Sequence, residues 1–448
     1  MVLAVEHSPG LQQVDTTPRA PYKSLLEMSP QEQIQSLTDL GSESFRFLHS
    51  HLPSKGFLPA SLGRHDNQDF DGTSWLRDSV ETCAPAVDPL FRQCFPELIN
   101  PAEQFYLEMM RRLLQLYAKE DEWKRFDHGL QRLHNNGMVT IYDELAPSTK
   151  TFLDGTRVEG WFHNQPDAWA RMISISVAGI KMGLPLLAQT KDDIKPAGEV
   201  LVKTVAHLAQ TTIANFACHG IWEGHLCQDH YSEKRKKVAS LIDAWRVWPK
   251  IEQDSNTRKY PTYINRPELS SAIYQGLHSM MREFPYDHTD PYNHPEAADS
   301  AQLTVANEIG LPKYEEDTIV QLTDPLEKEF GLIRHKGDQY KKGTEEAQWT
   351  LGLLYASRLN SIRAIRLFRL DAPTLAKIHL DKALAQMNKV NRMIYQYGYL
   401  PELHFQNENG EPIPNNNDLV WNRAMTPRTA APLIKAVIIA QQFDQQAA

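Results

Sequence analysis

The stretch SPQEQIQSLTDLGSESFRFL, residues 29–48, indicates the fold of this chain most directly. Ser29 and Glu32 have the spacing of a capping box, in which two side chains satisfy backbone N–H groups at a helix start. Pro30 fits the first helical position, where no N–H is needed. The apolar side chains that follow lie on one helix face, at Ile34, Leu37, Phe45 and Leu48. The stretch therefore predicts an amphipathic helix.

The same helical period continues along most of the chain. Asn100–Glu103 repeats the start signal, and Ser232 is placed to cap a further helix. Other periodic segments cover residues 166–184, 197–217, 267–284, 296–308, 345–369, 373–396 and 427–443. With a helix after Trp75, about eleven helices are expected, whereas runs that alternate with period two are scarce. These patterns predict an all-α fold with antiparallel neighbouring helices.

No compositional break or low-complexity tract divides the 448 residues. Residues 1–20 lack periodicity and are expected to form a loosely ordered leader, while residues 21–448 are expected to fold as one domain. The formal net charge is -9 and there is no dense Lys/Arg tract, so nucleic acid is not an expected partner. The predicted loops are 52–74, 120–164, 218–231, 249–265, 285–295, 310–344 and 397–426.

Cysteine usage and apolar content bear on the compartment. The cysteines are Cys83, Cys94, Cys218 and Cys227. They lack C-x-x-C spacing and are too sparse for a disulfide scaffold, so they are expected to be reduced thiols. The N-terminus does not look like a secretory signal, and the most apolar stretch, residues 172–187, is shorter than the ~20 residues that a membrane span needs. We expect a cytoplasmic protein with no membrane association; the sequence leaves its oligomeric state open.

Four segments combine aromatic rings with carboxylates, amides and guanidinium groups. They are Trp75–Asp78, Trp161–Asp167, Gly220–Gly224 and Tyr399–Phe405. A sugar ring offers C–H patches that pack on aromatic faces, and hydroxyls that need directed donors and acceptors. The segments therefore fit a carbohydrate site. Two structural interpretations stay open beside it: an ion pair at a helix start for Arg77 and Asp78, and a place in the core for Trp222.

Five motifs follow one another in a recognisable order. They are Trp75-x-Arg77-Asp78, Trp161-x-x-x-Gln165-x-Asp167, Gly220-Ile221-Trp222-Glu223, Arg334-His335-x-x-Asp338-x-Tyr340 and Pro401-Glu402-Leu403. Together, over about residues 30–440, they resemble glycoside hydrolase family fifteen, the glucoamylase family, to which the barrel of phosphorylase kinase regulatory subunits is related. The resemblance implies an (α/α)6 barrel with six inner and six outer helices. It also implies an inverting, exo-acting hydrolase of α-glucosides that needs no cofactor or metal.

The resemblance assigns roles residue by residue. Glu223 matches the general acid and Glu402 the catalytic base. Arg77 and Asp78 match residues that hold sugar hydroxyls, and Trp161 matches an aromatic near the scissile bond. The other expected substrate-binding residues, from the same motifs, are Trp75, Gln165, Asp167, Trp222, Arg334, His335 and Asp338. A carbohydrate is therefore the expected partner.

The two carboxyl groups need different pKa values for this chemistry. A protonated acid donates to the glycosidic oxygen, while an ionised carboxylate takes a proton from the attacking water. Glu223 follows Ile221 and Trp222, so desolvation is expected to disfavour its charged form. Glu402, near His404 and polar loop residues, is expected to stay ionised. Inverting enzymes hold the two carboxyls ~6.5–9.5 Å apart.

Three positions depart from the family pattern. Asp71 stands where glucoamylases usually have an aromatic residue, and Gly224 follows the acid where many fungal members have a second Glu. His163 stands at the position of a family Arg. Two alternatives therefore stay open: a catalytically silent barrel that binds a carbohydrate or a regulatory partner, and an enzyme for another sugar such as trehalose or a glucosyl conjugate. The linkage and substrate are not determined by the sequence.

Other polar clusters have simpler interpretations. His219, His225 and His230 with Asp229 lack the i, i+4 spacing of a helical metal motif, so no metal is expected. The segments Tyr286–Asp290 and Asn415–Asp418 look like turns, because Asn and Asp bond their own backbone; a place in the pocket lining stays open for the second segment. The basic run Lys234-Arg235-Lys236-Lys237 is expected to be a solvated helix face.

Overall fold

The computed structural model describes most of the chain. The described residues are 22–62, 72–128, 133–135, 138–140, 142–213, 217–219, 226–227, 231–253, 263–284, 288–289, 295–296, 299–338, 346–407, 409 and 411–447. The predicted leader, residues 1–20, lies outside them. Among these residues, no helix is both long and apolar enough to cross a membrane.

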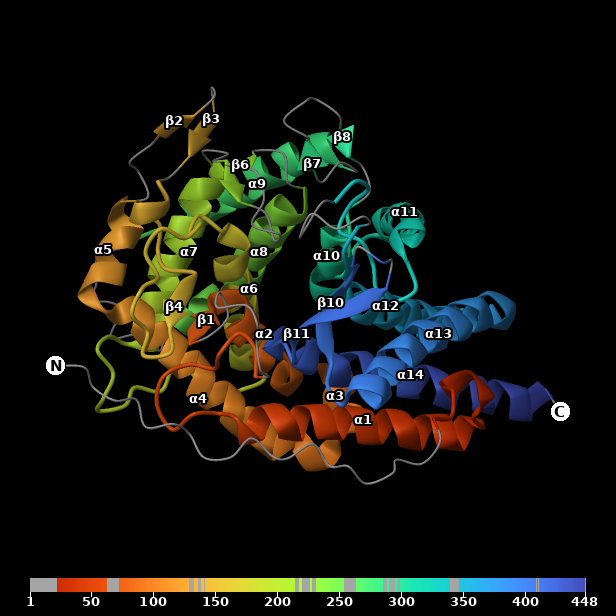
Figure 1. Ribbon diagram of the computed structural model, residues 1–448. Helices are drawn as coiled ribbons and strands as arrows, with labels where there is room; N and C mark the ends of the chain where they lie inside the picture. The colour runs from red at the N-terminus through yellow and green to blue at the C-terminus, as the bar shows by residue number, and fades with distance from the viewer. Residues whose placement is uncertain are drawn as a thin grey trace.

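Six helices of the described chain form a closed inner ring (Figure 1). They are α2 (Leu76–Val87), α6 (Pro166–Lys181), α8 (Tyr231–Gln253), α10 (Ala301–Ile309), α12 (Thr350–Arg369) and α14 (Val420–Ala447). Each packs against the next in this order, and α14 packs back against α2. The ring therefore closes only when the last helix of the chain meets one of the first.

An outer helix covers each inner one in the described chain. The outer helices are α1 (Pro30–Ser50), α4 (Ile99–Ala118), α7 (Ala197–Ile213), α9 (Arg266–Glu283), α11 (Lys313–Thr323) and α13 (Pro373–Tyr397). Inner and outer helices alternate along the chain, which confirms the predicted (α/α)6 barrel. Because each outer helix returns antiparallel to its inner neighbour, the inner helices all begin at the same end of the barrel.

Short elements complete the barrel. Two further helices are α3 (Pro89–Cys94) and α5 (Glu120–His128), and the 3-10 turns are η1 (Leu25–Glu27), η2 (Pro96–Leu98), η3 (Asp143–Leu145) and η5 (Asp324–Leu326). The strands are β1 (Thr73–Trp75), β2 (Leu133–Asn135), β3 (Met138–Thr140), β4 (Lys150–Phe152), β5 (Cys218–His219), β6 (Leu226–Cys227), β7 (His288–Thr289), β8 (Pro295–Glu296), β9 (Gln348–Trp349), β10 (Pro401–Gln406) and β11 (Pro412–Asn417). Several of these strands directly precede inner helices, so they build the barrel end where those helices begin.

Two large hydrophobic clusters hold the helices together. One joins α1, α2 and α4 to α12, α13 and α14, and the other lies between α6, α7, α8 and α9. Close helix contact depends on Gly179 of α6, where an added Cβ would lie 2.1 Å from the hydroxyl oxygen of Tyr106 on α4. With glycine at this position, the Tyr106 hydroxyl reaches α6 and donates to the carbonyl oxygen of Ile175, at 3.2 Å. The inner and outer rings are therefore packed without room for a side chain at this position.

The helix starts agree with the sequence predictions in part. The capping box of Ser29 and Glu32 is present at α1. The helices predicted from Asn100 and Ser232 are present as α4 and α8, but these two residues are not their caps, because α4 begins at Ile99 after an uncapped Leu98 and α8 begins at Tyr231. The predicted loops 120–164 and 310–344 contain helices α5 and α11, which are short and mostly polar. The chain 397–426 forms β10, β11 and the start of α14 rather than one loop.

The basic run on α8 was predicted wrongly. Lys234, Lys236 and Lys237 are at most 5% exposed, and Arg235 pairs with Glu315 at 3.4 Å. The run is buried in different directions: Lys236 lies 3.8 Å from Asp167 of the inner helix α6, whereas Lys234 donates to Ser279 of the outer helix α9 at 3.1 Å. The Asn415–Asp418 prediction holds only for its end: β11 extends to Asn417, and Asp418 has a left-handed backbone with φ of 54°.

Candidate active site

The start of α2 carries the first motif. Strand β1 pairs antiparallel with β4, which sets Trp75 opposite Lys150 just before the helix begins. The Arg77 side chain is 5% exposed; its Nη1 bonds the Asp167 Oδ2 at 3.1 Å, and its guanidinium lies 5.0 Å from the Trp421 ring centroid. Asp78 is 1% exposed. A helix-start ion pair between Arg77 and Asp78 was one open interpretation. The ion pair that Arg77 forms is instead with Asp167 on α6.

The start of α6 carries the second motif. Trp161 lies 5.6 Å from Trp75 between ring centroids, and the Lys150 ammonium is 3.7 Å from the Trp161 centroid. A cation above an indole face is a stabilising arrangement. Gln165 is buried, and its side-chain amide donates to the Phe162 carbonyl oxygen at 2.7 Å. Trp75 and Trp161 thus form an aromatic wall at this barrel end, with Lys150 against it.

His163 has a structural place in this segment. Its Nδ1 accepts from the Thr149 backbone N–H at 3.0 Å, and its Nε2 lies 2.8 Å from the Val158 carbonyl oxygen. Burial, followed by the repulsion of Arg157, lowers the pKa of His163 to about 3. The ring is therefore neutral at neutral pH and does not reproduce the charge of the Arg that the family places here.

The strand that leads to the predicted acid is tied to the aromatic wall. The Asn164 side chain donates to the Ala217 carbonyl oxygen at 2.9 Å, and the His219 N–H donates to the Asn164 carbonyl oxygen at 3.0 Å. The His219 ring also contacts Phe162, at 4.7 Å between centroids. Trp222 and Glu223 themselves lie outside the described residues, as do Asp71, Gly224, His225, Asp229, His230 and Tyr340. Their roles stay predictions.

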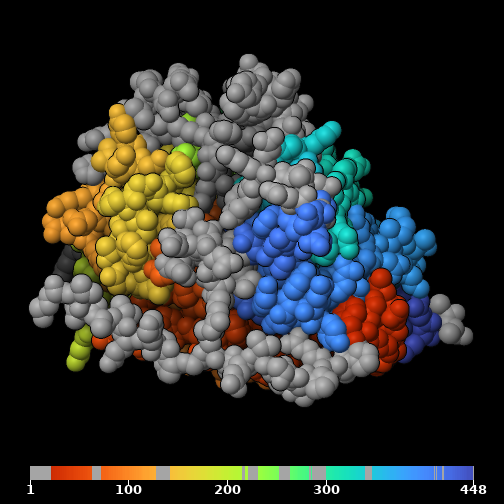
Figure 2. All heavy atoms as spheres, viewed as in Figure 1, coloured from red at the N-terminus to blue at the C-terminus, as the bar shows by residue number. Residues whose placement is uncertain are grey.

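Strand β10 carries Glu402 and is fixed to the start of α14. Glu402 is 6% exposed. The Asn422 side chain donates to the carbonyl oxygen of Pro401 at 3.1 Å, and its neighbour Trp421 is the ring that stacks on Arg77. The strand that carries the predicted base and the predicted sugar-binding arginine are therefore linked through two contacts of adjacent residues on α14, at one barrel end. In Figure 2, the segment before α6 (yellow) reaches the viewed surface left of the middle, and the segments around residue 400 (bright blue) reach it just right of the middle.

The Arg334 segment adjoins the same strand. Arg334 forms a two-pronged ion pair with Asp338, with Nε at 2.7 Å from Oδ2 and Nη2 at 2.5 Å from Oδ1. Its guanidinium lies 5.0 Å from the centroid of Trp349, which pairs with Leu403 on β10. His335 forms an isolated bridge with Asp299, directly before α10. The structure thus gathers all the described motif residues at the end where inner helices begin.

His404 differs from the environment expected near Glu402. Its ring stacks on Phe330 at 4.7 Å and contacts Tyr397 at 5.6 Å between centroids. Among the described residues, neither ring nitrogen has a hydrogen-bond partner. Burial lowers the pKa of His404 to about 4, so the ring is neutral at neutral pH. It therefore offers Glu402 no positive charge.

The buried histidines predict an acid-sensitive fold. His163, His207 and His404 have folded-state pKa values of about 3, 4 and 4, below the ordinary 6.5. Because the unfolded chain binds the extra protons, stability is full above pH 6.5 and is lost as pH falls toward 4. Each ring is expected to remove about 2 kcal/mol of unfolding free energy by pH 5. Urea unfolding at pH 7 and pH 5 measures this loss.

His207→Gln provides the specific check. This ring lies between Trp169 and Phe126, at 5.1 and 5.4 Å between centroids. The variant should lose about 2 kcal/mol less than the wild type between the two pH values. His278→Gln, an exposed control on α9, leaves the three buried rings in place. An unchanged pH dependence in His207→Gln would contradict the assignment.

Sequence reasoning missed three residues that shape this end of the barrel. Lys150 and Trp421 contact predicted site residues, and Lys236 lies 3.8 Å from Asp167. Trp421 had no motif around it, although aromatic residues in a predicted loop were a usable signal. Lys236 was hidden because its basic run looked like a solvent-facing pattern. No group of three or more potential metal ligands occurs within the described part of the chain.

Solved structures match this arrangement over nearly the whole chain. A glucoamylase from Saccharomycopsis fibuligera matches with a TM-score of 0.62 at 14% identity, covering 93% of this chain and 96% of that one. The chain has the glucoamylase fold. A glycoside hydrolase family 15 glucoamylase from Hypocrea jecorina gives a TM-score of 0.63 at 13% identity, covering 91% and 73%. A glycosidase in complex with glucose gives 0.56 at 16% identity, covering 91% and 98%.

The glucoamylase likeness is one of structure. Neither the protein-family models nor the curated proteins yield a match to the sequence. At 13–16% identity the likeness shows the fold, and it does not carry the activity of those proteins to this chain. The glucoamylase fold nonetheless confirms the resemblance that the five motifs indicated. The argument for function therefore depends on the residues of this chain.

Proposed function

We propose that the glucoamylase-like barrel is an inverting, exo-acting glycoside hydrolase that releases glucose from an α-glucoside. The observation that supports this most is that α14 holds both β10, through the bond from Asn422 to Pro401, and Arg77, through the ring of Trp421, at the end where the inner helices begin. A buried carboxylate, a guanidinium and two neighbouring indole rings meet the needs of a sugar ring and its reacting bond. The neighbouring strand β5 brings the chain to the segment that contains Glu223.

The reaction assigns one proton transfer to each carboxyl group. Glu223 donates its proton to the glycosidic oxygen as the bond from that oxygen to the anomeric carbon breaks. A water molecule attacks the anomeric carbon from the opposite face, and Glu402 accepts a proton from it. An α-glucoside therefore yields β-glucose and an alcohol. After product release, a proton returns from Glu402 to Glu223 through solvent.

The substrate is held by groups from α2 and from the segments that lead into α2, α6 and α12. Arg77 and Asp78 supply a donor and an acceptor for hydroxyls of the terminal glucose, and Trp75 with Trp161 supplies a face for its C–H groups. Arg334, oriented by Asp338, is a further donor on the other side of β10. One of the matching glycosidases was solved with glucose, which supports a carbohydrate as the partner.

The anomer of the first product tests the proposal. Maltose, isomaltose, trehalose, maltotriose and simple glucosyl conjugates are supplied to the wild-type enzyme, and ¹H NMR follows the newly formed anomeric proton before mutarotation. We expect one substrate class to yield β-glucose first. If the attacked glucose unit is released first as α-glucose, inversion is wrong; for trehalose, inversion gives one α- and one β-glucose, whereas retention gives two α-glucose molecules. If no substrate is cleaved but glucose still binds, the chain is a carbohydrate-binding barrel without turnover.

A further inference from the structure

One side chain from every inner helix of the described barrel contributes to a ring. Five of its six neighbouring pairs are in contact, and the sixth pair, Lys236 and Glu308, is joined by electrostatic attraction. The ring consists of Arg77 (α2), Asp167 (α6), Lys236 (α8), Glu308 (α10), Tyr355 (α12) and Trp421 (α14). The six side chains are all at most 5% exposed. They lie in the barrel interior near the starts of α2, α6 and α14, and the ring includes one predicted sugar-binding group, Arg77.

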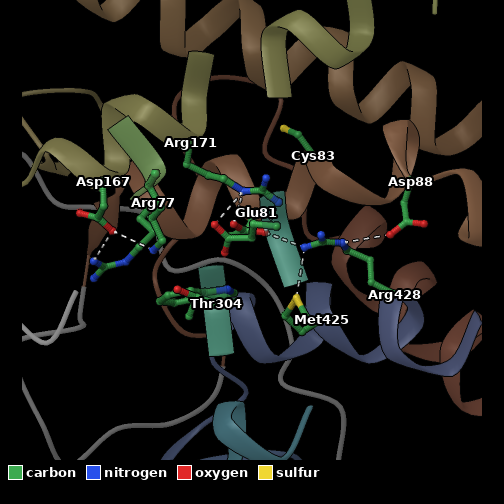
Figure 3. Close-up of polar contacts among 12 residues, drawn as sticks. Arg77, Glu81, Cys83, Asp88, Asp167, Arg171, Thr304, Met425 and Arg428 are labelled. Atoms are coloured by element: carbon green, nitrogen blue, oxygen red, sulfur yellow. Dashed lines mark hydrogen bonds and ion pairs between the residues drawn. The ribbon is translucent and has the colours of Figure 1, made fainter. Parts of the chain in front are cut away.

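In one half of the ring, two cations, Arg77 and Lys236, share one anion, the carboxylate of Asp167. Asp167 Oδ2 lies 3.1 Å from the Arg77 Nη1 and 3.8 Å from the Lys236 Nζ. Figure 3 shows the Asp167 carboxylate joined to Arg77. Burial opposes the charge on Lys236, but the carboxylates of Glu308, Asp167 and Glu233 outweigh it and raise the Lys236 pKa. Lys236 is therefore a buried cation held beside a second cation, Arg77, by the carboxylate between them.

The other half of the ring returns to Arg77 through hydroxyl and aromatic groups. The Tyr355 hydroxyl donates to Glu308 Oε1 at 3.0 Å. The Trp421 indole N–H donates to the Tyr355 hydroxyl at 3.1 Å, and the Trp421 ring stacks on the Arg77 guanidinium. Arg77 is thus fixed at two places, by the Asp167 carboxylate and by the face of Trp421.

We propose that Asp167 and Lys236 are positioning residues, with Asp167 acting as the shared counter-ion that sets the place of the Arg77 guanidinium. The inference rests on the proposed function only for the role of Arg77 in holding a sugar. It changes the interpretation of Asp167, which the sequence motif assigned to direct substrate binding. Asp167 has 0% exposure, and the carboxylate oxygen that it shares faces protein cations.

If Asp167 is a shared counter-ion, a second substitution, at Lys236, should reverse the effect of the first. Asp167→Asn removes the anion and leaves two buried like charges without the group that holds them together, so Arg77 is displaced. Lys236→Met in the same chain removes the second cation, so the repulsion that displaces Arg77 disappears. A residue that bound the sugar directly would not be rescued by a change on another helix. The sign of the coupling therefore separates positioning from direct contact.

The experiment measures kcat, KM and the dissociation constant for glucose in four proteins: wild type, Asp167→Asn, Lys236→Met and the double variant. We expect Asp167→Asn to raise KM and the glucose dissociation constant at least about tenfold. The double variant, which keeps the charge balance, should stay within about threefold of the wild type. The proposal is overturned if KM and the glucose dissociation constant of the double variant are tenfold or more above the wild-type values, or higher than those of Asp167→Asn. This comparison of the double variant with the wild type stands even without a folded Asp167→Asn protein.

A control and a structural readout complete the test. Asp88→Asn/Arg358→Met removes another buried ion pair, with a distance of 2.8 Å, that has no described contact with Arg77. Its KM should match the wild-type value even if its melting temperature falls. Crystal structures of Asp167→Asn and the double variant should show Arg77 displaced in the first and returned in the second. An unmoved Arg77 in Asp167→Asn contradicts positioning. If the wild type neither binds nor cleaves a sugar, the proposed function fails. The position of Arg77 in the crystal structures of the two variants would still show whether Asp167 positions it.

Discussion

Glu402→Gln is expected to lower kcat for the best α-glucoside by about 10²- to 10⁴-fold, the range that a general acid or base contributes. The amide keeps the shape of the side chain but cannot accept the proton of the attacking water. KM should change much less, because the substitution leaves Arg77 and the indole rings in place. Steady-state kinetics with the substrate identified by the product assay measures both quantities. Glu223→Gln should show a loss of the same order.

The hairpin offers a matched control for this prediction. Glu411, on the same β10–β11 unit, is exposed and bonds only Asn407 in the described structure. Glu411→Gln should therefore keep the wild-type kcat. If Glu402→Gln retains more than about a tenth of the wild-type kcat, its role as base is wrong. A leaving group that needs no acid, such as a glucosyl fluoride, should restore Glu223→Gln but not Glu402→Gln.

Arg171→Met is expected to give the largest loss of stability, about 3–5 kcal/mol of unfolding free energy. Arg171 donates to both oxygens of Glu81, at 2.5 and 3.1 Å, and Arg428 donates to Glu81 at 2.7 Å (Figure 3). Burial alone would raise the pKa of Glu81, but the two guanidinium groups outweigh it and hold the pKa at about 2. Removing Arg171 leaves a fully buried carboxylate with half its partners. Urea unfolding at pH 7 measures the effect.

Two further variants show whether the loss comes from the unpaired charge. Glu81→Gln/Arg171→Met removes the charge as well as its partner, so it should be more stable than Arg171→Met alone. Arg246→Met removes an arginine that is 62% exposed and lies 3.8 Å from Asp243, so it should change stability by less than about 0.5 kcal/mol. A loss in Arg171→Met no larger than that of Arg246→Met would show that the buried pair contributes nothing.

The helical framework could be predicted because the sequence signals for most barrel helices lie within the helices themselves. The capping box at Ser29 and the apolar stripes of α7, α9 and α13 depend only on neighbouring residues. Helix α11 escaped prediction because its sequence, KYEEDTIVQLT, has few buried positions and is stabilised by packing on α10. The basic run of α8 was misread because a sequence shows which residues are charged, and the partners that bury Lys236 come from α6 and α10.

The candidate site was predictable as a set of segments and less so as a set of contacts. The motifs around Arg77, Trp161 and Glu402 were named in advance, and the structure brings them to one barrel end. The pairing of Arg77 with Asp167 across 90 residues, and its stacking on Trp421, are properties of the closed barrel. His404 shows the same limit. Its place beside Glu402 in the sequence suggested a polar neighbour, whereas its ring is packed between Phe330 and Tyr397.

The order of the helices has a consequence for how this protein is made. Helix α1, residues 30–50, packs along α14, residues 420–447, and α2 packs on α14 as well. During synthesis, the first helices emerge from the ribosome hundreds of residues before their partner exists. Their apolar faces must stay shielded until α14 is released, and closing the ring over so many intervening residues makes that step slow. A nascent chain that stops short of α14 is therefore left with an open barrel, and it becomes a client for chaperones or proteases rather than a smaller enzyme.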